Sequence, residues 1–263
     1  MRTSWTSRFH PVARSADLVD GHIYHGRLLG QELAVWRDGE GRPNAWENRC
    51  PHRGMRLTVG MHLGSGVRCL YHGLRYASGS GRCTAIPSLG DRELPRQLNI
   101  CVKTFAVREK YGLVWASLAE SASEPVIAAL DGVQHTTLRS VVIGVAAENV
   151  MDALANSHHH GTVVPAEAGT QRLSFASSTN DKTIILIVQP ADLQKSIVHS
   201  VAIGEFASDD STTRSHRRGL VSDHNARLCA LRDALESTAI APRATSSVLS
   251  SSAQARELLQ TPT

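Results

Sequence analysis

Two short segments of the sequence each pair a cysteine with a histidine. Cys50 and His52 are separated by one residue, sixteen residues follow, and Cys69 and His72 are separated by two. Two thiolates and two imidazoles can ligate a zinc ion or a two-iron cluster. The glycine after each histidine has no Cβ and lets two loops approach a compact cofactor closely. The sequence therefore predicts a metal centre between two loops.

The spacing of the ligands distinguishes the two kinds of metal. Structural zinc sites usually have at least two residues between paired ligands, whereas one pair here has a single residue between them. In a Rieske [2Fe–2S] centre two histidines replace two cysteines on one iron. Each loop then gives its cysteine to one iron and its histidine to the other. The pattern favours a Rieske centre bound by Cys50, His52, Cys69 and His72, and zinc remains the alternative.

The residues around both motifs resemble one family over 9–118. The segments that carry the resemblance are AWENRCPHRGMRLTVG, VRCLYHGLRYASGSGRCTAIPS, FHPVARSADL, LLGQELAVWRDGEG and YGLVWASL. They resemble Rieske non-haem iron oxygenases of the ring-hydroxylating and demethylating type. The resemblance implies that a separate reductase or ferredoxin supplies electrons, which pass to a mononuclear Fe(II) that activates O2 against a small organic substrate. It also implies a homotrimer, because in this family the electron crosses between subunits.

The second iron site of that family matches this chain only in part. The family's histidines come from the pattern N-x-x-D-x-x-H-x-x-x-x-H, to which Asn149, Asp152 and His160 correspond. The first histidine falls on Ala155, which cannot ligate iron. By resemblance, Asp152 is the carboxylate that bridges electrons toward that missing histidine. His159 lies one helical turn beyond Ala155 and is the best substitute ligand.

The third iron ligand of the family is a carboxylate late in the chain. Asp209 is our first candidate, with Asp210 and Asp223 as alternatives. Because of Ala155, two readings of the activity stay open. One is a working oxygenase, and the other is an electron-transfer Rieske protein or a decayed oxygenase without mononuclear iron. We expect low or absent turnover. A zinc-stabilised binding module is the third hypothesis.

The elements that must position these residues form an α+β protein. Short strands between turn signals, including 66–70, 74–77, 101–107 and 113–118, predict an all-β Rieske domain over 8–120. A shortened helix-grip-like catalytic domain is predicted over 126–240. Its predicted elements are strands at 138–145, 183–188 and 196–204 and helices at 148–158 and 220–236. The segment 162–171 resembles a peptide read through from a bacterial intergenic repeat, which would interrupt this domain. A disordered tail is predicted at 241–263.

Composition narrows the remaining possibilities. The net charge is +4, and the basic residues are scattered apart from a small cluster at 214–218, so no nucleic-acid partner is expected. We find no apolar run of membrane-spanning length and no signal core, and we therefore expect a cytoplasmic protein with no membrane partner. Five cysteines are an odd number and favour reduced thiols. No phosphate-binding glycine motif supports a flavin or nicotinamide site.

Overall fold

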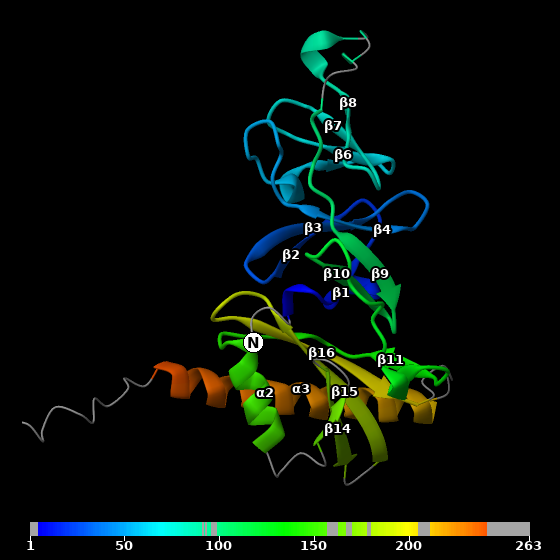
Figure 1. Ribbon diagram of the computed structural model, residues 1–263. Coiled ribbons are helices and arrows are strands. Elements are labelled where there is room, and N and C mark those ends of the chain that lie inside the picture. Colours follow the sequence, from blue (N-terminus) through cyan, green and yellow to red (C-terminus); the bar gives the residue numbers. More distant parts are fainter. Residues whose placement is uncertain are drawn as a thin grey trace, which may run out of the picture.

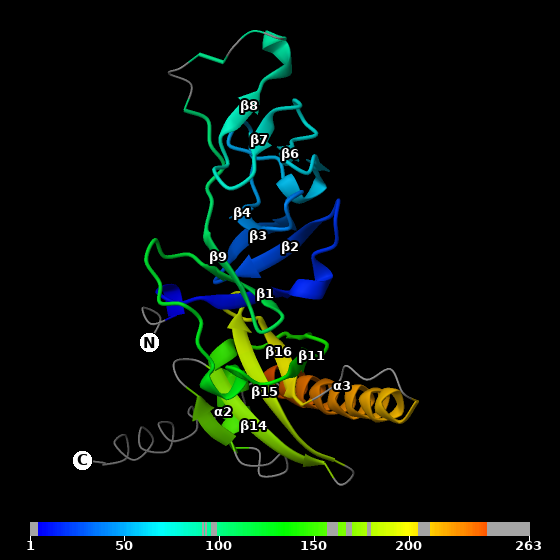
Figure 2. The same ribbon diagram turned by 90° about the vertical axis from the view of Figure 1, so that its right-hand side faces the viewer.

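The computed structural model describes residues 5–90, 92, 94–95, 99–156, 163–166, 170–177, 180–204 and 211–240. Within 156–182, and at 211–214, 216–217 and 240, it describes the backbone alone. The described part is a stack of layers, with the loops around β5–β8 at one end and helices α2 and α3 at the other (Figures 1 and 2). The chain reaches the far end of this stack by residue 90 and returns.

The N-terminal part consists of short strands that all pair antiparallel. The strands are β1 (His10–Arg14), β2 (Ile23–Leu28), β3 (Gln31–Arg37), β4 (Pro43–Glu47), β5 (Met61–His62), β6 (Gly66–Arg68), β7 (Arg75–Ala77), β8 (Cys83–Ala85), β9 (Ala106–Lys110) and β10 (Leu113–Ser117). They form three sheets with the orders β1-β10-β9, β2-β3-β4 and β5-β6-β7-β8. Glycine is required at the β6–β7 contact, because a Cβ at Gly66 would lie 2.0 Å from the Tyr76 carbonyl oxygen.

One predicted strand, 101–107, is wrong. Its apolar residues belong to a connection that crosses from one sheet to another and pairs only at isolated points. Cys101 bridges Arg82, and Thr104 bridges Trp46. Regular pairing begins at β9, because only there does the chain run beside β10. The apolar residues of this connection pack against different cores, with Val102 in the core of the loop region and Phe105 against the core between β3 and β10.

The second part of the chain is an antiparallel sheet covered on one face by two helices. Its strands are β11 (His135–Thr137), β12 (Val141–Ile143), β13 (Val163–Ala166), β14 (Thr170–Ser177), β15 (Asn180–Pro190) and β16 (Ser196–Ile203). The order is β11-β16-β15-β14-β13, with β12 also paired to β16. Helix α2 spans Ala147–Asn156 and helix α3 spans Ser211–Ile240. The segment 163–166, predicted to be part of an interruption, extends this sheet as its edge strand.

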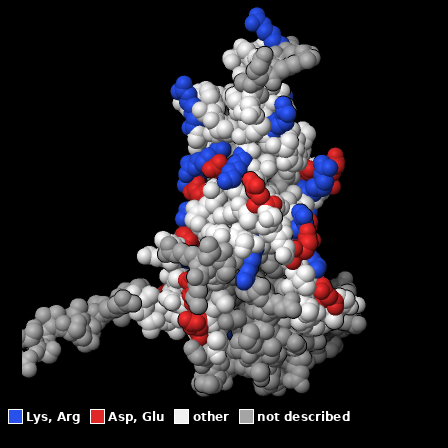
Figure 3. Space-filling model, in the orientation of Figure 1, with Lys and Arg blue, Asp and Glu red and all other residues white. Residues whose placement is uncertain are grey.

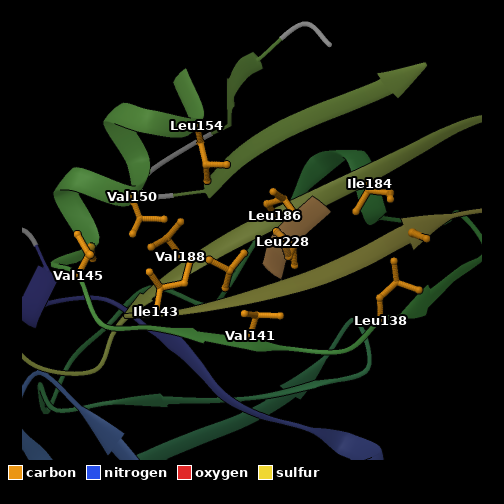
Figure 4. Close-up of a cluster of buried hydrophobic side chains, with 13 residues drawn as sticks. Leu138, Val141, Ile143, Val145, Val150, Leu154, Ile184, Leu186, Val188 and Leu228 are labelled. Carbon is orange, nitrogen blue, oxygen red and sulfur yellow. The ribbon is translucent and has the colours of Figure 1, made fainter. Parts of the chain in front are cut away.

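Both faces of the central strands β15 and β16 are buried, which explains their nearly continuous apolar sequence. Ile184, Leu186 and Val188 point toward the helices and pack with Val150, Leu154 and Leu228 (Figure 4). The alternate residues Ile185 and Ile187 pack with Leu113 and Trp115 of the N-terminal part. Because side chains alternate between the faces of a strand, one sheet forms the wall of two cores.

Several predicted boundaries differ from those of the structure. The predicted strand 138–145 is confined to β12, and the predicted helix 148–158 corresponds to α2. Helix α3 begins at Ser211, nine residues before the predicted start at 220. The predicted domain limits 8–120 and 126–240 stay predictions, and the predicted tail 241–263 lies outside the described residues.

Candidate metal centre

The two predicted ligand loops are closed by the same pattern of backbone hydrogen bonds. The first lies between β4 and β5, and the second lies between β6 and β7. The N–H of Gly54 donates to the Cys50 carbonyl at 2.8 Å, and the N–H of Gly73 donates to the Cys69 carbonyl at 3.0 Å. Each cysteine N–H donates in turn to the carbonyl five residues later. Gly54 and Gly73 have φ values of 72° and 74°, a conformation that favours glycine. Two separate stretches of sequence thus build matching turns.

The four predicted ligands come together as a sulfur pair and a nitrogen pair. Cys50 and Cys69 are 3% and 1% exposed and belong to the core of the loop region. His52 and His72 are exposed, and their ring centroids are 4.7 Å apart. Among the described residues, no three His, Cys, Asp or Glu side chains converge on a single metal ion. A sulfur pair and a nitrogen pair would give two ligands to each of two irons, which is the ligand set of a Rieske [2Fe–2S] cluster.

Tyr76 is a contact of the site that the sequence did not reveal. Its hydroxyl oxygen lies 3.1 Å from Cys50 Sγ, and the side chain is 1% exposed. Burial, together with the neighbouring Cys50 thiol, raises the pKa of Tyr76 above its usual value, so the phenol keeps its proton. A ligating cysteine has no proton, and the hydroxyl must therefore be the donor. Burial also raises the pKa of the Cys69 thiol, so its thiolate needs stabilisation from a bound metal.

Glu32 of β3 holds the two ends of the first ligand loop. Its carboxylate accepts hydrogen bonds from Arg49 at 2.9 Å and from Arg56 at 2.7 and 3.2 Å. Arg27 lies 3.5 Å from the same carboxylate and 3.2 Å from Asp192, in the turn between β15 and β16. The hydrogen bond from Arg56 is the largest cause of the lowered pKa of Glu32. The loop is therefore linked by charged contacts to both parts of the chain.

The structure leaves the predicted mononuclear iron site as a prediction. His159, His160 and Asp209 lie outside the described residues or have no described side chain. Asp152 and Ala155 are both exposed on α2, on the side away from the buried Val150 and Leu154. Asp223, a further candidate carboxylate, is exposed on α3. The described residues therefore give Asp152 no ligand partner to orient.

Two buried histidines of the second part were also missed from the sequence. His199 is 2% exposed, with Nδ1 2.9 Å from Ser140 Oγ and Nε2 2.8 Å from Gln189 Oε1. Gln189 donates in turn to the Arg27 carbonyl at 2.6 Å. Burial lowers the pKa of His199 to about 3 and that of His224 to about 4. Both imidazoles are neutral and serve as buried hydrogen-bonding groups. The sequence signal for His199 was a histidine inside an apolar segment, whereas His224 lies among polar residues and had no such signal.

These features define a class of protein. A small all-β domain presents two matched cysteine–histidine loops, and it packs on an antiparallel sheet covered by helices. That combination defines a two-part Rieske [2Fe–2S] protein with an α+β fold, as the sequence predicted. The described residues include no helix long and apolar enough to cross a membrane.

Comparison with known proteins identifies a domain of a known family in the chain. Residues 8–106 match the Rieske [2Fe-2S] domain. The chain is 38% identical over 209 residues to oxidoreductase NdmD of Pseudomonas putida, covering 74% of this chain and 35% of that protein. It is 40% identical over 114 residues to the oxygenase component of chloroacetanilide N-alkylformylase from Rhizorhabdus wittichii, covering 43% and 31%. The chain thus spans about a third of the length of these relatives.

Solved structures show the same fold. Pseudomonas putida CBB5 NdmA, as a QL mutant with theobromine, has a TM-score of 0.67 at 18% identity, over 86% of this chain and 82% of that one. Dicamba monooxygenase has a TM-score of 0.64 at 17% identity, over 92% of both chains. Residues 8–106 therefore form a Rieske [2Fe-2S] domain, and the chain resembles Rieske non-haem iron oxygenases, since its relatives include components named as monooxygenases and dioxygenases. The resemblance and the cluster type predicted from the sequence are confirmed.

Proposed function

We propose that this protein is the [2Fe–2S] component of an oxygenase system that hydroxylates or demethylates a small organic molecule. The observation that carries the proposal is the arrangement of Cys50 and Cys69 in the core with His52 and His72 exposed together. A [2Fe–2S] cluster bound there supplies one-electron uptake and release at about −150 to +300 mV. The cysteines would hold its buried side and the histidines its exposed side, with the Tyr76 hydroxyl donating a hydrogen bond to Cys50 Sγ.

The surface around the histidines supports electron exchange with another protein. Leu70 and Tyr71, next to His72, are 55% and 57% exposed. Residues 48–90 contain six arginines and no aspartate or glutamate, and positive charge is prominent at this end of the molecule (Figure 3). An apolar contact surface within a basic region is suited to an acidic electron-donor protein, because complementary charge speeds association. We propose a reductase or ferredoxin of that kind as the donor.

Charge also supports the proposed homotrimer. Residues 1–118 contain 17 basic and 9 acidic residues, a net charge of +8, whereas residues 119–240 contain 9 and 14, a net charge of −5. A basic first part attracts the acidic second part of another copy, which is compatible with the head-to-tail contacts of a ring. We propose the cytoplasm as its location, since none of the five cysteines forms a disulfide.

A second candidate function is electron transfer without an iron site of its own. Ala155 stands where the family has an iron ligand. The alignment with NdmD covers 74% of this chain and must extend well beyond the Rieske domain, whereas those with two named oxygenase components cover 43% and 38%. The alignment with oxidoreductase NdmD therefore includes much of the second part of this chain, whereas the alignments with these two oxygenase components are shorter.

Metal content and electron paramagnetic resonance (EPR) decide between the candidates. Two irons and two sulfides per chain, with a Rieske signal after dithionite reduction, are the expected result for the proposed cluster. Zinc without sulfide would disprove it. A third iron supports an oxygenase acting by itself, and its absence supports the electron-transfer candidate. Ala155→His should then increase iron binding if the remaining ligands are present, and the exposed position will accept the larger side chain.

A further inference from the structure

The loop that carries Cys50 and His52 has a basic residue at each end, Arg49 before it and Arg56 after it. Both side chains converge on the carboxylate of Glu32, which is 12% exposed. Arg49 also donates to the Gly54 carbonyl at 3.3 Å, inside the loop. The backbone N–H of Asn48 donates to the Glu32 carbonyl at 3.0 Å. One residue of β3 therefore receives both ends of the loop.

Glu32 cannot be replaced from within the loop region. Residues 48–90 contain no aspartate or glutamate, so the charges of Arg49 and Arg56 can be balanced only by an acid from another part of the chain. A nearly buried carboxylate is itself unfavourable unless it is paired, and here it is paired by Arg49, Arg56 and Arg27. The contacts are mutually dependent, because removal of Glu32 leaves neighbouring guanidinium groups without their shared partner.

We propose that Glu32 is the positioning residue of the cluster, and the inference rests on the proposed function. Its carboxylate fixes the separation of Arg49 and Arg56 and thereby the turn that presents Cys50 and His52. It also places a negative charge at the ends of the loop that would hold a cofactor whose charge changes on reduction. Glu32 thus controls how long the cluster is retained and how readily it accepts an electron. Through Arg27 and Asp192, the same carboxylate ties the loop to the β15–β16 turn.

The chain offers a matched control for this idea. Arg37 and Glu109 form a bidentate pair, with both distances 2.8 Å, between β3 and β9. That pair involves the same β3 strand as Glu32, but neither of its side chains hydrogen-bonds to a described residue of the ligand loops. Glu109→Gln therefore removes a comparable carboxylate, whereas Glu32→Gln removes the one that holds the loop.

The experiment compares the wild-type protein with Glu32→Gln and Glu109→Gln, each loaded with cluster. The half-life of the cluster against an iron chelator should shorten at least about fivefold in Glu32→Gln and stay within twofold in Glu109→Gln. The reduction potential should become more positive in Glu32→Gln alone, because a nearby negative charge is lost. Thermal unfolding of both variants measures general destabilisation separately.

Two results would overturn the inference. One is a half-life and potential in Glu32→Gln equal to those of the wild type, and the other is an equal change in Glu109→Gln. If Glu32→Gln cannot be loaded, Arg49→Met and Arg56→Met provide the test, because each should shorten the half-life and their effects should not add. Unchanged half-lives in both arginine variants would also refute it. Absence of a Rieske signal in the wild-type protein contradicts the proposed function itself.

Discussion

The hydrogen bond from Tyr76 to Cys50 gives a quantitative prediction for the cluster. Tyr76→Phe removes only the hydroxyl group, and the ring keeps its place in a core where the residue is 1% exposed. A hydrogen bond to a charged group contributes about 1.5–3 kcal/mol. Reduction adds negative charge to the cluster, so the donor stabilises the reduced state more than the oxidised state. The reduction potential should therefore fall in the variant.

The size of the shift follows from that energy. If the whole contribution were specific to the reduced state, about 1.5–3 kcal/mol would correspond to about 65–130 mV for one electron. The hydroxyl also stabilises the oxidised state, so if about half of the contribution is specific to the reduced state we expect a decrease of about 30–65 mV. A redox titration followed by the EPR signal measures it.

A second tyrosine provides the control. The Tyr111 hydroxyl donates to Asp131 at 2.6 Å and accepts from the Ile127 N–H at 3.0 Å, in a core separate from that of the cluster. Tyr111→Phe should leave the potential unchanged. An unchanged or higher potential in Tyr76→Phe, or an equal decrease in Tyr111→Phe, would refute the reasoning.

Three further changes test other parts of the structure. Gly73→Ala should lower the iron content per chain, because a Cβ at this position would lie 2.8 Å from Pro87 Cγ. Gly79 has a similar φ, and a Cβ there would have no atom within 4 Å, so Gly79→Ala should leave the iron content unchanged. An equal loss of iron in both variants would contradict this. As the pH is lowered from 6.5 to about 4, an unfolded histidine binds a proton, whereas buried His199, with its pKa of about 3, does not. The unfolding free energy should therefore fall by about 1.4 kcal/mol for each unit by which the pH is lowered, per such histidine. Denaturant titrations of His199→Gln should show a shallower pH slope than those of the wild type, and parallel slopes would disprove it. Leu154→Ala, in the core beneath α2, should lower the unfolding free energy by about 2–5 kcal/mol while the EPR signal per chain stays constant; loss of the signal would contradict separate cores.

The metal centre was predictable because its chemistry is written in residue types and short spacings. Cys50, His52, Cys69 and His72 needed no knowledge of the tertiary fold, since each pair lies within one turn. Tyr76 and Glu32 could not be found in this way. Tyr76 has an ordinary place in a strand, and Glu32 meets Arg49 and Arg56 only after β3 packs beside the loop. Contacts that depend on such packing have no signature in a single sequence.

The elements of the fold were predictable to different degrees for a physical reason. Strand β10 was predictable because its short apolar run is buried on both faces, with Leu113 and Trp115 in one core and Val114 and Ala116 in another. The start of α3 was missed because its first turns contain Arg214, Arg218 and Gly219, which do not repeat the apolar spacing. The basic residues of the first part were interpreted as scattered, because the whole-chain charge of +4 conceals opposite charges in the two parts.

The layered arrangement limits where the electron can go. The sheets β2-β3-β4 and β1-β10-β9 lie between the cluster loops and α2 in both views (Figures 1 and 2). His52 and His72 face outward, whereas the buried cysteine side faces the core that leads toward those sheets. A cluster bound there would therefore have its exposed side toward another polypeptide rather than toward α2 of the same chain. An Ala155→His variant that binds a third iron should consequently gain turnover only in an assembly where that α2 meets the histidines of a second copy.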